Sequence, residues 1–246
     1  MAGTHHPIEC GDCGTGIDAS ADSAETRTPC PTCGSTKRAY YASASNMQPS
    51  NYLLDNYIAH RLSLLTECGA PELQDNSAWL NAFILNTVFR VQIPPKLRAY
   101  LFNFIRRTEG VLAAYRDARG VLLEYLSTPS TTISPYFRAL ASFEICISQA
   151  YQGYELLAAA AGQKLYEQGD GSAEEKLQKV YVDSKHMDRM IHGEKLPVEA
   201  TSGIWITNSA IESSRAVLTF LGLHKLLSEM HTLTERLSTF TRQNDG

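Results

Sequence analysis

The chain has 246 residues, 43% of them hydrophobic, and a formal net charge of -4. This length and hydrophobic content suffice for one helical core of ordinary size plus a small module. The mildly acidic balance excludes a general electrostatic attraction to nucleic acid or anionic membranes, so binding to either would require a local basic patch.

The apolar segments of the sequence bear on its location. No apolar run reaches the roughly 20 residues that a helix needs to span a bilayer. Residues 1–8 lack the hydrophobic segment of a secretion signal. We therefore expect a cytoplasmic protein with no membrane partner.

Four of the six cysteines form two Cys-x-x-Cys pairs near the N-terminus: Cys10 with Cys13, and Cys30 with Cys33. Sixteen residues, 14–29, separate the pairs, a spacing typical of a four-cysteine zinc site. A tight turn within each pair can direct both sulfurs at one ion, and the glycine after each pair suits the positive φ of such a turn. Residues 15–28 are almost without large apolar side chains, so the metal must supply the folding energy. The sequence predicts a zinc ribbon over residues 1–39.

Two other chemistries use cysteine pairs of this kind. A thioredoxin-type dithiol needs one pair beside a βαβ unit, whereas this sequence has two pairs and no such unit. Iron in a rubredoxin-like site would use the same four sulfurs, and the sequence leaves iron open. Four thiolates fill a tetrahedral site and leave no position for water, so we expect structural Zn²⁺ rather than a catalytic ion.

The charge of the ribbon region bears on what it contacts. Residues 1–50 hold three basic residues, Arg27, Lys37 and Arg38, against five acidic ones. This balance favours protein contact or a purely structural role over nucleic-acid binding.

Beyond the ribbon, residues 40–50 are polar, rich in alanine and serine, and predicted to form a linker. Residues 51–246 are predicted to be a helical domain, because apolar residues recur at the 3- and 4-residue helical spacing. The Pro-Pro pair at 94–95 opens a long helix. Ser172, with Glu175 three residues later, marks the start of another.

The predicted elements give the fold class. In chain order they are helices over 51–67, 78–91 after a Ser77 cap, 95–127, 135–168 and 173–191, a β-hairpin of 203–207 with 216–220, and a last helix over 221–241. We therefore predict a mainly α protein, a helical bundle with a short β-hairpin and an N-terminal zinc ribbon.

Apolar stripes indicate which helix faces form the core. Their residues are Leu97, Leu101, Phe104, Val111, Tyr115, Leu122 and Leu126 in the first long helix, Phe137, Leu140, Ile147, Tyr151, Tyr154, Ala158, Ala161 and Leu165 in the second, and Leu177, Val180, Tyr181, Ser184, Met187 and Ile191 in the third. Cys68 and Cys146 are expected to be small core residues, because free cysteine is among the most buried residue types.

Three ionisable residues fall on or near these apolar faces: Arg119, Glu144 and Glu155. One interpretation places the two carboxylates at the rim of the bundle, paired with arginines. The other is a polar seam between helices that contains Arg119 and Glu144, since buried ions need partners.

A second polar group occupies the end of the helix predicted over 173–191: Lys185, His186, Arg189 and His192. Lys185, Arg189 and His192 have the spacing of one basic strip, and His186 is expected to point away from the core face. A solvated helix end explains the pattern, because the helix dipole favours cations near a C-terminus. The functional interpretation is a dimer or ligand surface, with His186, Arg189 and His192 as candidate catalytic residues.

The segments 136–144 and 149–155, rich in tyrosine and glutamate, and the following helix with Lys-His at 185–186 resemble HEPN-type helical bundles. The resemblance covers about residues 95–242. It implies a helical bundle, a homodimer, and a role in prokaryotic toxin–antitoxin or phage-defence systems.

Active members of that family are dimeric ribonucleases with an Arg-x4–6-His motif at the dimer cleft. Here two residues separate Arg189 from His192, and eight separate Arg215 from His224. Neither spacing fits the motif, so the resemblance favours a bundle and a dimer over catalysis.

The most basic segment is 90–119, where seven basic residues against two acidic ones give a net charge of +5. The basic residues are Arg90, Lys96, Arg98, Arg106, Arg107, Arg116 and Arg119. Such a concentration in an acidic protein is a candidate RNA or DNA face. The arginines are distributed around the helix, however, so a mixed solvated surface is the alternative.

Together these patterns predict a zinc-stabilised interaction protein without catalytic activity, connected with prokaryotic defence or toxin–antitoxin systems. Its expected partner is a second copy of the chain or another protein. The alternatives are a divergent HEPN-like ribonuclease and a nucleic-acid-binding adaptor that uses the segment 90–119.

Overall fold

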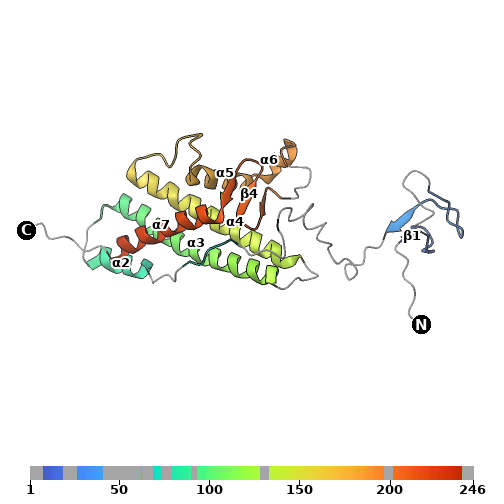
Figure 1. Ribbon diagram of the computed structural model, residues 1–246, viewed down its shortest axis with the longest axis horizontal. Coiled ribbons are helices and arrows are strands. Elements are labelled where there is room, and N and C mark those ends of the chain that lie inside the picture. Colours follow the sequence, from blue (N-terminus) through green and yellow to red (C-terminus); the bar gives the residue numbers. More distant parts are fainter. Residues whose placement is uncertain are drawn as a thin grey trace, which may run out of the picture. The chain divides into compact units, whose positions relative to one another are not determined.

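The computed structural model describes residues 8–18, 27–40, 62, 69–73, 79–89, 93–127, 133–196 and 202–239. The chain divides into two compact units, residues 1–48 and 49–246 (Figure 1). Several features expected from the sequence lie outside the described residues: the linker beyond Tyr40, the helix over 51–67 apart from Leu62, the Ser77 cap, Cys68 and Arg90.

The N-terminal unit is built on a small antiparallel ladder. Strand β1 (Ile8–Cys10) pairs with β2 (Arg38–Tyr40), so that Cys10 lies opposite Arg38. Tyr40, the first residue of the predicted linker, therefore belongs to a strand. Among the described residues of this unit, the buried hydrophobic cluster is Cys10, Ile17 and Cys30, with Ile8 packed against it. Two of these three are cysteines, so the unit has almost no hydrophobic core.

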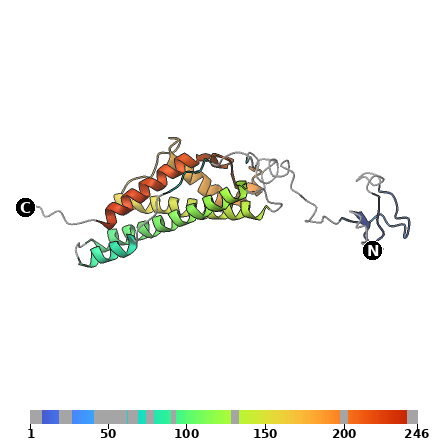
Figure 2. The same ribbon diagram turned by 60° about the horizontal axis from the view of Figure 1, so that its bottom comes forward.

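The second unit is mainly helical, as predicted, and its centre is a helical hairpin. Helix α3 (Pro95–Ser127) and helix α4 (Ser134–Ala161) run antiparallel along most of their length (Figures 1 and 2). The ring of Tyr115 meets that of Phe143 at 6.2 Å, with the ring planes nearly perpendicular. Edge-to-face pairs of this kind add to the burial of both rings.

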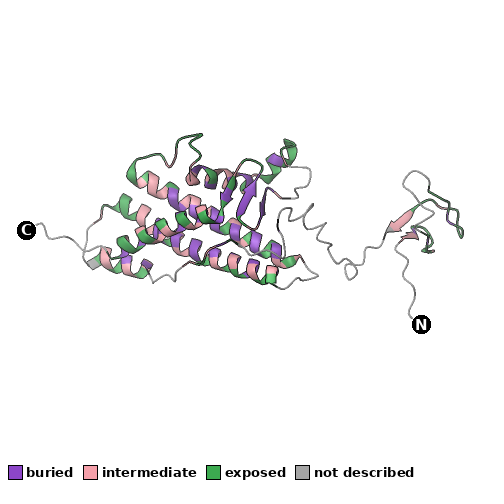
Figure 3. Ribbon diagram, viewed as in Figure 1, coloured by how far each residue is buried: buried purple, intermediate pink, exposed green. Residues whose placement is uncertain are grey.

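The described residues of this unit form four further helices and a sheet. The helices are α2 (Trp79–Phe89), α5 (Ala173–Lys185), α6 (Met187–His192) and α7 (Phe220–Ser238). Helices α2, α5 and α7 contact the hairpin directly, whereas α6 contacts α5. Helix α7 lies over the α3–α4 pair in Figure 2 and also contacts α2 and α5. Buried residues gather on the facing sides of these helices, and exposed residues lie on their outer sides (Figure 3).

The sheet of this unit has three antiparallel strands in the order β3 (Ile204–Ile206), β4 (Ala210–Ser213) and β5 (Val217–Thr219). A hairpin of 203–207 with 216–220 was predicted, and both of these strands are present as β3 and β5, but they do not pair with each other because β4 lies between them. Strand β4 itself was not predicted. In the structure Glu212 is buried and accepts a hydrogen bond from Nε1 of Trp205 at 3.2 Å.

Helix α4 ends at Ala161 rather than near residue 168. Gly162 adopts a left-handed conformation, with φ of 66°, and its N–H donates to the carbonyls of Ala158 and Ala159. This pairing of the last carbonyls with a following glycine terminates a helix, whatever the apolar spacing beyond it.

The helix predicted over 173–191 is interrupted at His186, whose φ of −116° and ψ of 42° are not helical. Helix α6 begins at the next residue with a different phase. As a result Met190 is buried, whereas Met187 and Ile191, both predicted to face the core, are exposed.

The remaining stripe residues mostly match the structure. Phe104, Val111, Tyr115 and Leu122 of α3 are buried, as is Cys146 of α4, which was predicted as a core residue. Leu97 and Phe137 are exposed, because they lie at the ends of the hairpin. No helix of the described segments combines the length and apolar character needed to cross a membrane.

Candidate metal centre and surface cavities

The two Cys-x-x-Cys segments fold into equivalent turns. Gly14 and Gly34 follow them with φ of 73° and 71°, a conformation that side chains disfavour. The N–H of Gly14 donates to the carbonyl of Cys10 at 2.9 Å, and that of Gly34 to the carbonyl of Cys30 at 2.8 Å. In both turns the N–H of the first cysteine also bonds a carbonyl five residues later. The local sequence thus shapes both turns in the same way.

These turns bring the four cysteine sulfurs together. The Sγ atoms of Cys10 and Cys33 are 3.5 Å apart, those of Cys13 and Cys30 are 3.6 Å apart, and all four lie within 4.8 Å of one another. With Zn–S bonds of about 2.3 Å, the sulfurs of a tetrahedral site are about 3.8 Å apart. The four predicted ligands therefore lie close enough to bind one metal ion.

Backbone amides favour the thiolate form at two of these cysteines. The N–H of Thr32 is the main cause that lowers the pKa of Cys30 to about 6, and the N–H of Asp12 lowers the pKa of Cys10. At Cys33 the N–H of Ser35 also favours the thiolate, but the neighbouring thiols raise its pKa to about 12. Four thiolates at this separation need a cation between them, which is the condition a metal ion meets.

Few other contacts support the ribbon. Lys37 Nζ lies 3.0 Å from Asp12 Oδ1, but both side chains are largely exposed, and such pairs contribute little. Arg38 donates to the carbonyls of Thr28 and Ser35, which ties β2 to the second cysteine turn.

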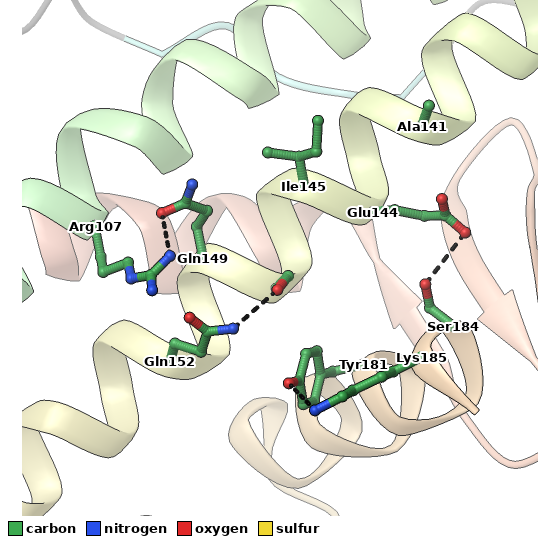
Figure 4. A pocket seen from close by; sticks show the side chains of 10 residues that line it. Arg107, Ala141, Glu144, Ile145, Gln149, Gln152, Tyr181, Ser184 and Lys185 are labelled. Atoms are coloured by element: carbon green, nitrogen blue, oxygen red, sulfur yellow. Dashed lines mark hydrogen bonds between the residues drawn. The ribbon is translucent and has the colours of Figure 1, made fainter.

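A groove of about 570 Å³ lies between helices of the helical unit (Figure 4). Helices α3, α4 and α5 contribute its lining: Arg107, Ala141, Glu144, Ile145, Ser148, Gln149, Gln152, Tyr181, Ser184 and Lys185. We call this the α4 groove, because six of these residues belong to α4.

Hydrogen bonds across the α4 groove hold side chains from different helices. Arg107 of α3 donates to Oε1 of Gln149 at 3.0 Å. Ser184 of α5 donates to Oε1 of Glu144 at 3.2 Å. Burial raises the pKa of Glu144, in part offset by this bond, and desolvation lowers the pKa of Arg107. The groove thus presents amides, a hydroxyl and partly desolvated charges beside an exposed apolar side chain, Ile145.

The polar seam predicted between Arg119 and Glu144 does not form. Arg119 Nε donates to the carbonyl of Ala70 at 2.9 Å, whereas Glu144 is bound to Ser184. Glu155 accepts from the hydroxyl of Tyr151 at 2.7 Å. Neither carboxylate has an arginine partner among the described residues, so the predicted rim of arginine pairs is also not observed.

The cluster predicted around His186 divides between three environments. Lys185 lines the α4 groove. His192 lies outside both cavities, and its Nδ1 is 2.9 Å from the carbonyl of Asp188 on its own helix. His186 and Arg189 line a second cavity of about 200 Å³.

This second cavity lies between the α5–α6 junction and the turn after β4, and we call it the α6 cavity. Its lining is Val182, Asp183, His186, Arg189, Met190, Lys195, Ser214 and Arg215. Asp183 was not given a role in the sequence analysis, Lys195 and Ser214 were not candidates, and Arg215 was noted only for its distance from His224. Lys195 follows the helix break at His186 and Ser214 follows β4, and neither the break nor the strand was predicted, so no local signal connected these residues.

The basic segment 90–119 presents no single charged face in the part that the structure describes. Lys96, Arg98 and Arg106 are exposed, whereas Arg107 turns toward α4 and Arg119 toward Ala70. Arg116 is half-buried. Nucleic-acid binding through this segment stays a prediction.

The chain matches no protein-family model, no curated protein and no solved structure.

Proposed function

We propose that this protein is a zinc-stabilised interaction protein without catalytic activity. The observation that carries the proposal is the group of four cysteine sulfurs within 4.8 Å of one another. Four thiolates complete a tetrahedral site and leave no position for water or substrate. The metal would therefore have a structural role.

Zinc is the proposed ion, and its role is to fold the ribbon. The site suits Zn²⁺ or iron by geometry, and zinc is the common ion of closed Cys₄ structural sites. The buried residues Cys10, Ile17 and Cys30 are too few to hold the unit together by hydrophobic burial. Metal binding would supply that free energy instead.

The α4 groove is the proposed contact surface for a protein partner. Gln149 and Gln152 offer amide donors and acceptors that suit a peptide backbone, and Ile145 offers apolar contact. Concave sites of this size with a few convergent polar groups are typical binding sites. The partner is a second copy of the chain or another protein.

A photo-crosslinking amino acid placed in the groove tests this surface. At position 152 it should give one adduct of defined mass, whereas at Thr232, an exposed position on α7, it should give none. An adduct of twice the chain mass identifies a homodimer, and any other mass identifies a different partner. Equal adduct yields at the two positions, or none at either, would contradict the proposed surface.

A divergent HEPN-like ribonuclease is the second candidate, and one observation favours it. His186 and Arg189 line the same cavity, where an imidazole could move protons and a guanidinium could stabilise phosphate charge. The test is cleavage of a structured RNA with EDTA present. If the unchanged chain cleaves the RNA, and cleavage is lost in His186→Ala or His192→Ala with circular dichroism unchanged, the ribonuclease function would be supported and the proposal of a non-catalytic interaction protein would be wrong. The connection with prokaryotic defence stays a prediction.

A further inference from the structure

The α6 cavity combines positive side chains with one buried carboxylate. Arg189, Lys195 and Arg215 carry permanent charges there, and His186 adds an imidazole. Asp183 is only 2% exposed and lies on the same lining. A pocket with this composition differs from the α4 groove, whose lining is mostly uncharged.

One oxygen of Asp183 is already bound. Arg215 Nε donates to Oδ1 at 2.8 Å, and the guanidinium also donates to the carbonyl of Lys179 at 3.5 Å. The Asp183–Arg215 pair is therefore neutral as a unit. It holds the turn after β4 against α5.

The other oxygen of Asp183 lacks a donor among the described residues. Oδ2 is buried and accepts no hydrogen bond from any described protein group. A buried carboxylate oxygen without a donor costs free energy, and native proteins rarely keep one without a reason. A ligand that supplies a proton donor at this point would satisfy it.

The remaining charge of the cavity attracts anions. Arg189 and Lys195 are exposed and have no ion-pair partner among the described residues. With the Asp183–Arg215 pair neutral, the lining carries a net positive charge. Ser214, also exposed on the rim, adds a hydroxyl that can donate to an anion.

A ligand of this cavity must carry negative charge for Arg189 and Lys195 and must also supply a hydrogen to Oδ2 of Asp183. One class of oxyanion meets both requirements. A fully ionised oxyanion such as sulfate would bind the cations but would place a lone pair against Oδ2 of Asp183. A protonated oxyanion can bind the cations and also donate its own hydrogen to Oδ2. Inorganic phosphate keeps a proton near neutral pH, whereas sulfate does not.

We propose that the α6 cavity is a phosphate-binding site, in which Arg189 and Lys195 bind the charge and Oδ2 of Asp183 accepts the P–OH hydrogen. The ligand is inorganic phosphate, whose dianion keeps a P–OH, whereas a phosphate monoester near neutral pH is mostly a dianion without a proton to donate. The cavity volume of about 200 Å³ suits the phosphate group itself rather than a whole nucleotide. This site goes beyond the proposed protein-binding function and does not depend on it.

Calorimetric titration of the full chain with inorganic phosphate at neutral pH and fixed ionic strength tests the site. Parallel titrations use sulfate and a nucleoside 5′-monophosphate. Phosphate should bind at least about tenfold more tightly than sulfate, since an unmet hydrogen bond to a charged group costs about that much. The monophosphate, mostly a dianion without a P–OH, should bind about as weakly as sulfate, and a monophosphate that binds more tightly than inorganic phosphate would overturn the proposal.

Matched variants locate the site. Arg189→Ala and Lys195→Ala should each weaken phosphate binding by about tenfold, because each removes a charged donor. Lys176→Ala removes an exposed cation on α5 outside the cavity and should leave the affinity unchanged. Equal losses in all three variants would mean non-specific charge attraction and would contradict the site.

Asp183→Asn separates selectivity from affinity. Its amide can donate to a fully ionised oxyanion, so the preference for phosphate over sulfate should disappear. If this variant fails to fold, the comparison of phosphate with sulfate in the unchanged chain still decides. No phosphate binding at millimolar concentration, equal affinity for sulfate, or unchanged selectivity in a folded Asp183→Asn would each overturn the proposal.

Discussion

The hydroxyl oxygen of Tyr136 on α4 accepts a hydrogen bond from the backbone N–H of Ile206 on β3, across 3.2 Å. Strand β3 lies at the edge of the sheet, so this N–H has no partner strand. Both residues are buried, and burial raises the pKa of Tyr136 to about 12, so the phenol stays neutral. One side chain thus joins the central hairpin to the sheet.

Removal of this hydroxyl should destabilise the helical unit. We expect Tyr136→Phe to lower the free energy of unfolding by about 1–3 kcal/mol, because the N–H of Ile206 stays buried without an acceptor. Urea denaturation followed by circular dichroism measures the change. Tyr100→Phe, at a half-buried position on α3, is the control and should change stability far less. Equal effects of the two variants would contradict the role given to this bond.

Phe143 and Phe137 on α4 offer a matched pair for the core. Phe143 is fully buried, with its ring 5.5 Å from that of Phe220, whereas Phe137 is 43% exposed. Phe143→Ala should cost about 3–5 kcal/mol of stability through lost burial and a cavity. Phe137→Ala should cost about 1 kcal/mol or less. The midpoints of urea unfolding measure both losses. Similar midpoints for the two variants would contradict the assignment of Phe143 to the core.

Gly203 and Gly120 should respond in opposite directions to alanine. A Cβ on Gly203 would lie 2.5 Å from the backbone carbonyl oxygen of Asp183, which cannot rotate away. Gly203→Ala should therefore destabilise by about 1–3 kcal/mol. A Cβ on Gly120, within α3, meets nothing within 4 Å, so Gly120→Ala should stabilise by up to about 1 kcal/mol. Thermal unfolding of both variants checks the signs, and the same sign for both would contradict the packing at Gly203.

Glu175 should make the stability of the helical unit depend on pH. Its carboxylate accepts from the N–H of Gly169 at 2.7 Å and of Gly171 at 2.9 Å, and it pairs with Lys179. The Gly169 bond is the main cause that lowers its pKa from the usual value of 4.5. A lowered folded-state pKa gives stability that is present above the unfolded-state pKa and is lost as pH falls through the folded-state pKa.

We therefore expect the unchanged chain to lose stability as pH falls below about 4.5. Glu175→Gln should be less stable at neutral pH and should lose less on acidification, because its side chain does not titrate. Unfolding midpoints measured from neutral pH to pH below 4 give the change of stability with pH, the slope, for the unchanged chain and for Glu175→Gln. Glu174→Gln, at the adjacent position, is the control and should keep the slope of the unchanged chain. A Glu175→Gln slope equal to that of the unchanged chain would count against this bond network.

The sequence predicted most of what depends on local spacing. The two cysteine pairs and the glycines after them define their own turns, so Cys10, Cys13, Cys30 and Cys33 could be identified without tertiary information. Ser172 was also predicted correctly as a cap, and its Oγ accepts from the N–H of Glu175 at 3.1 Å.

What was missed depends on contacts between distant segments. Strand β4 was not predicted, and its buried Glu212 is bound to Trp205 on the neighbouring strand β3. His186 fits a continuous helical pattern, so nothing in the local sequence marked the break that buries Met190. Asp183 and Arg215 are 32 residues apart in sequence, and the cavity that they share exists only once α5 packs beside the sheet.

Metal content tests the central claim of this account most directly. The full chain, purified without added metal, should contain one zinc per chain by elemental analysis. Cys30→Ser should abolish that zinc, while Cys146→Ser, at a buried position in the core of the helical unit, should keep it. Less than half a zinc per chain, iron in its place, or unchanged zinc in Cys30→Ser would contradict a zinc-stabilised ribbon.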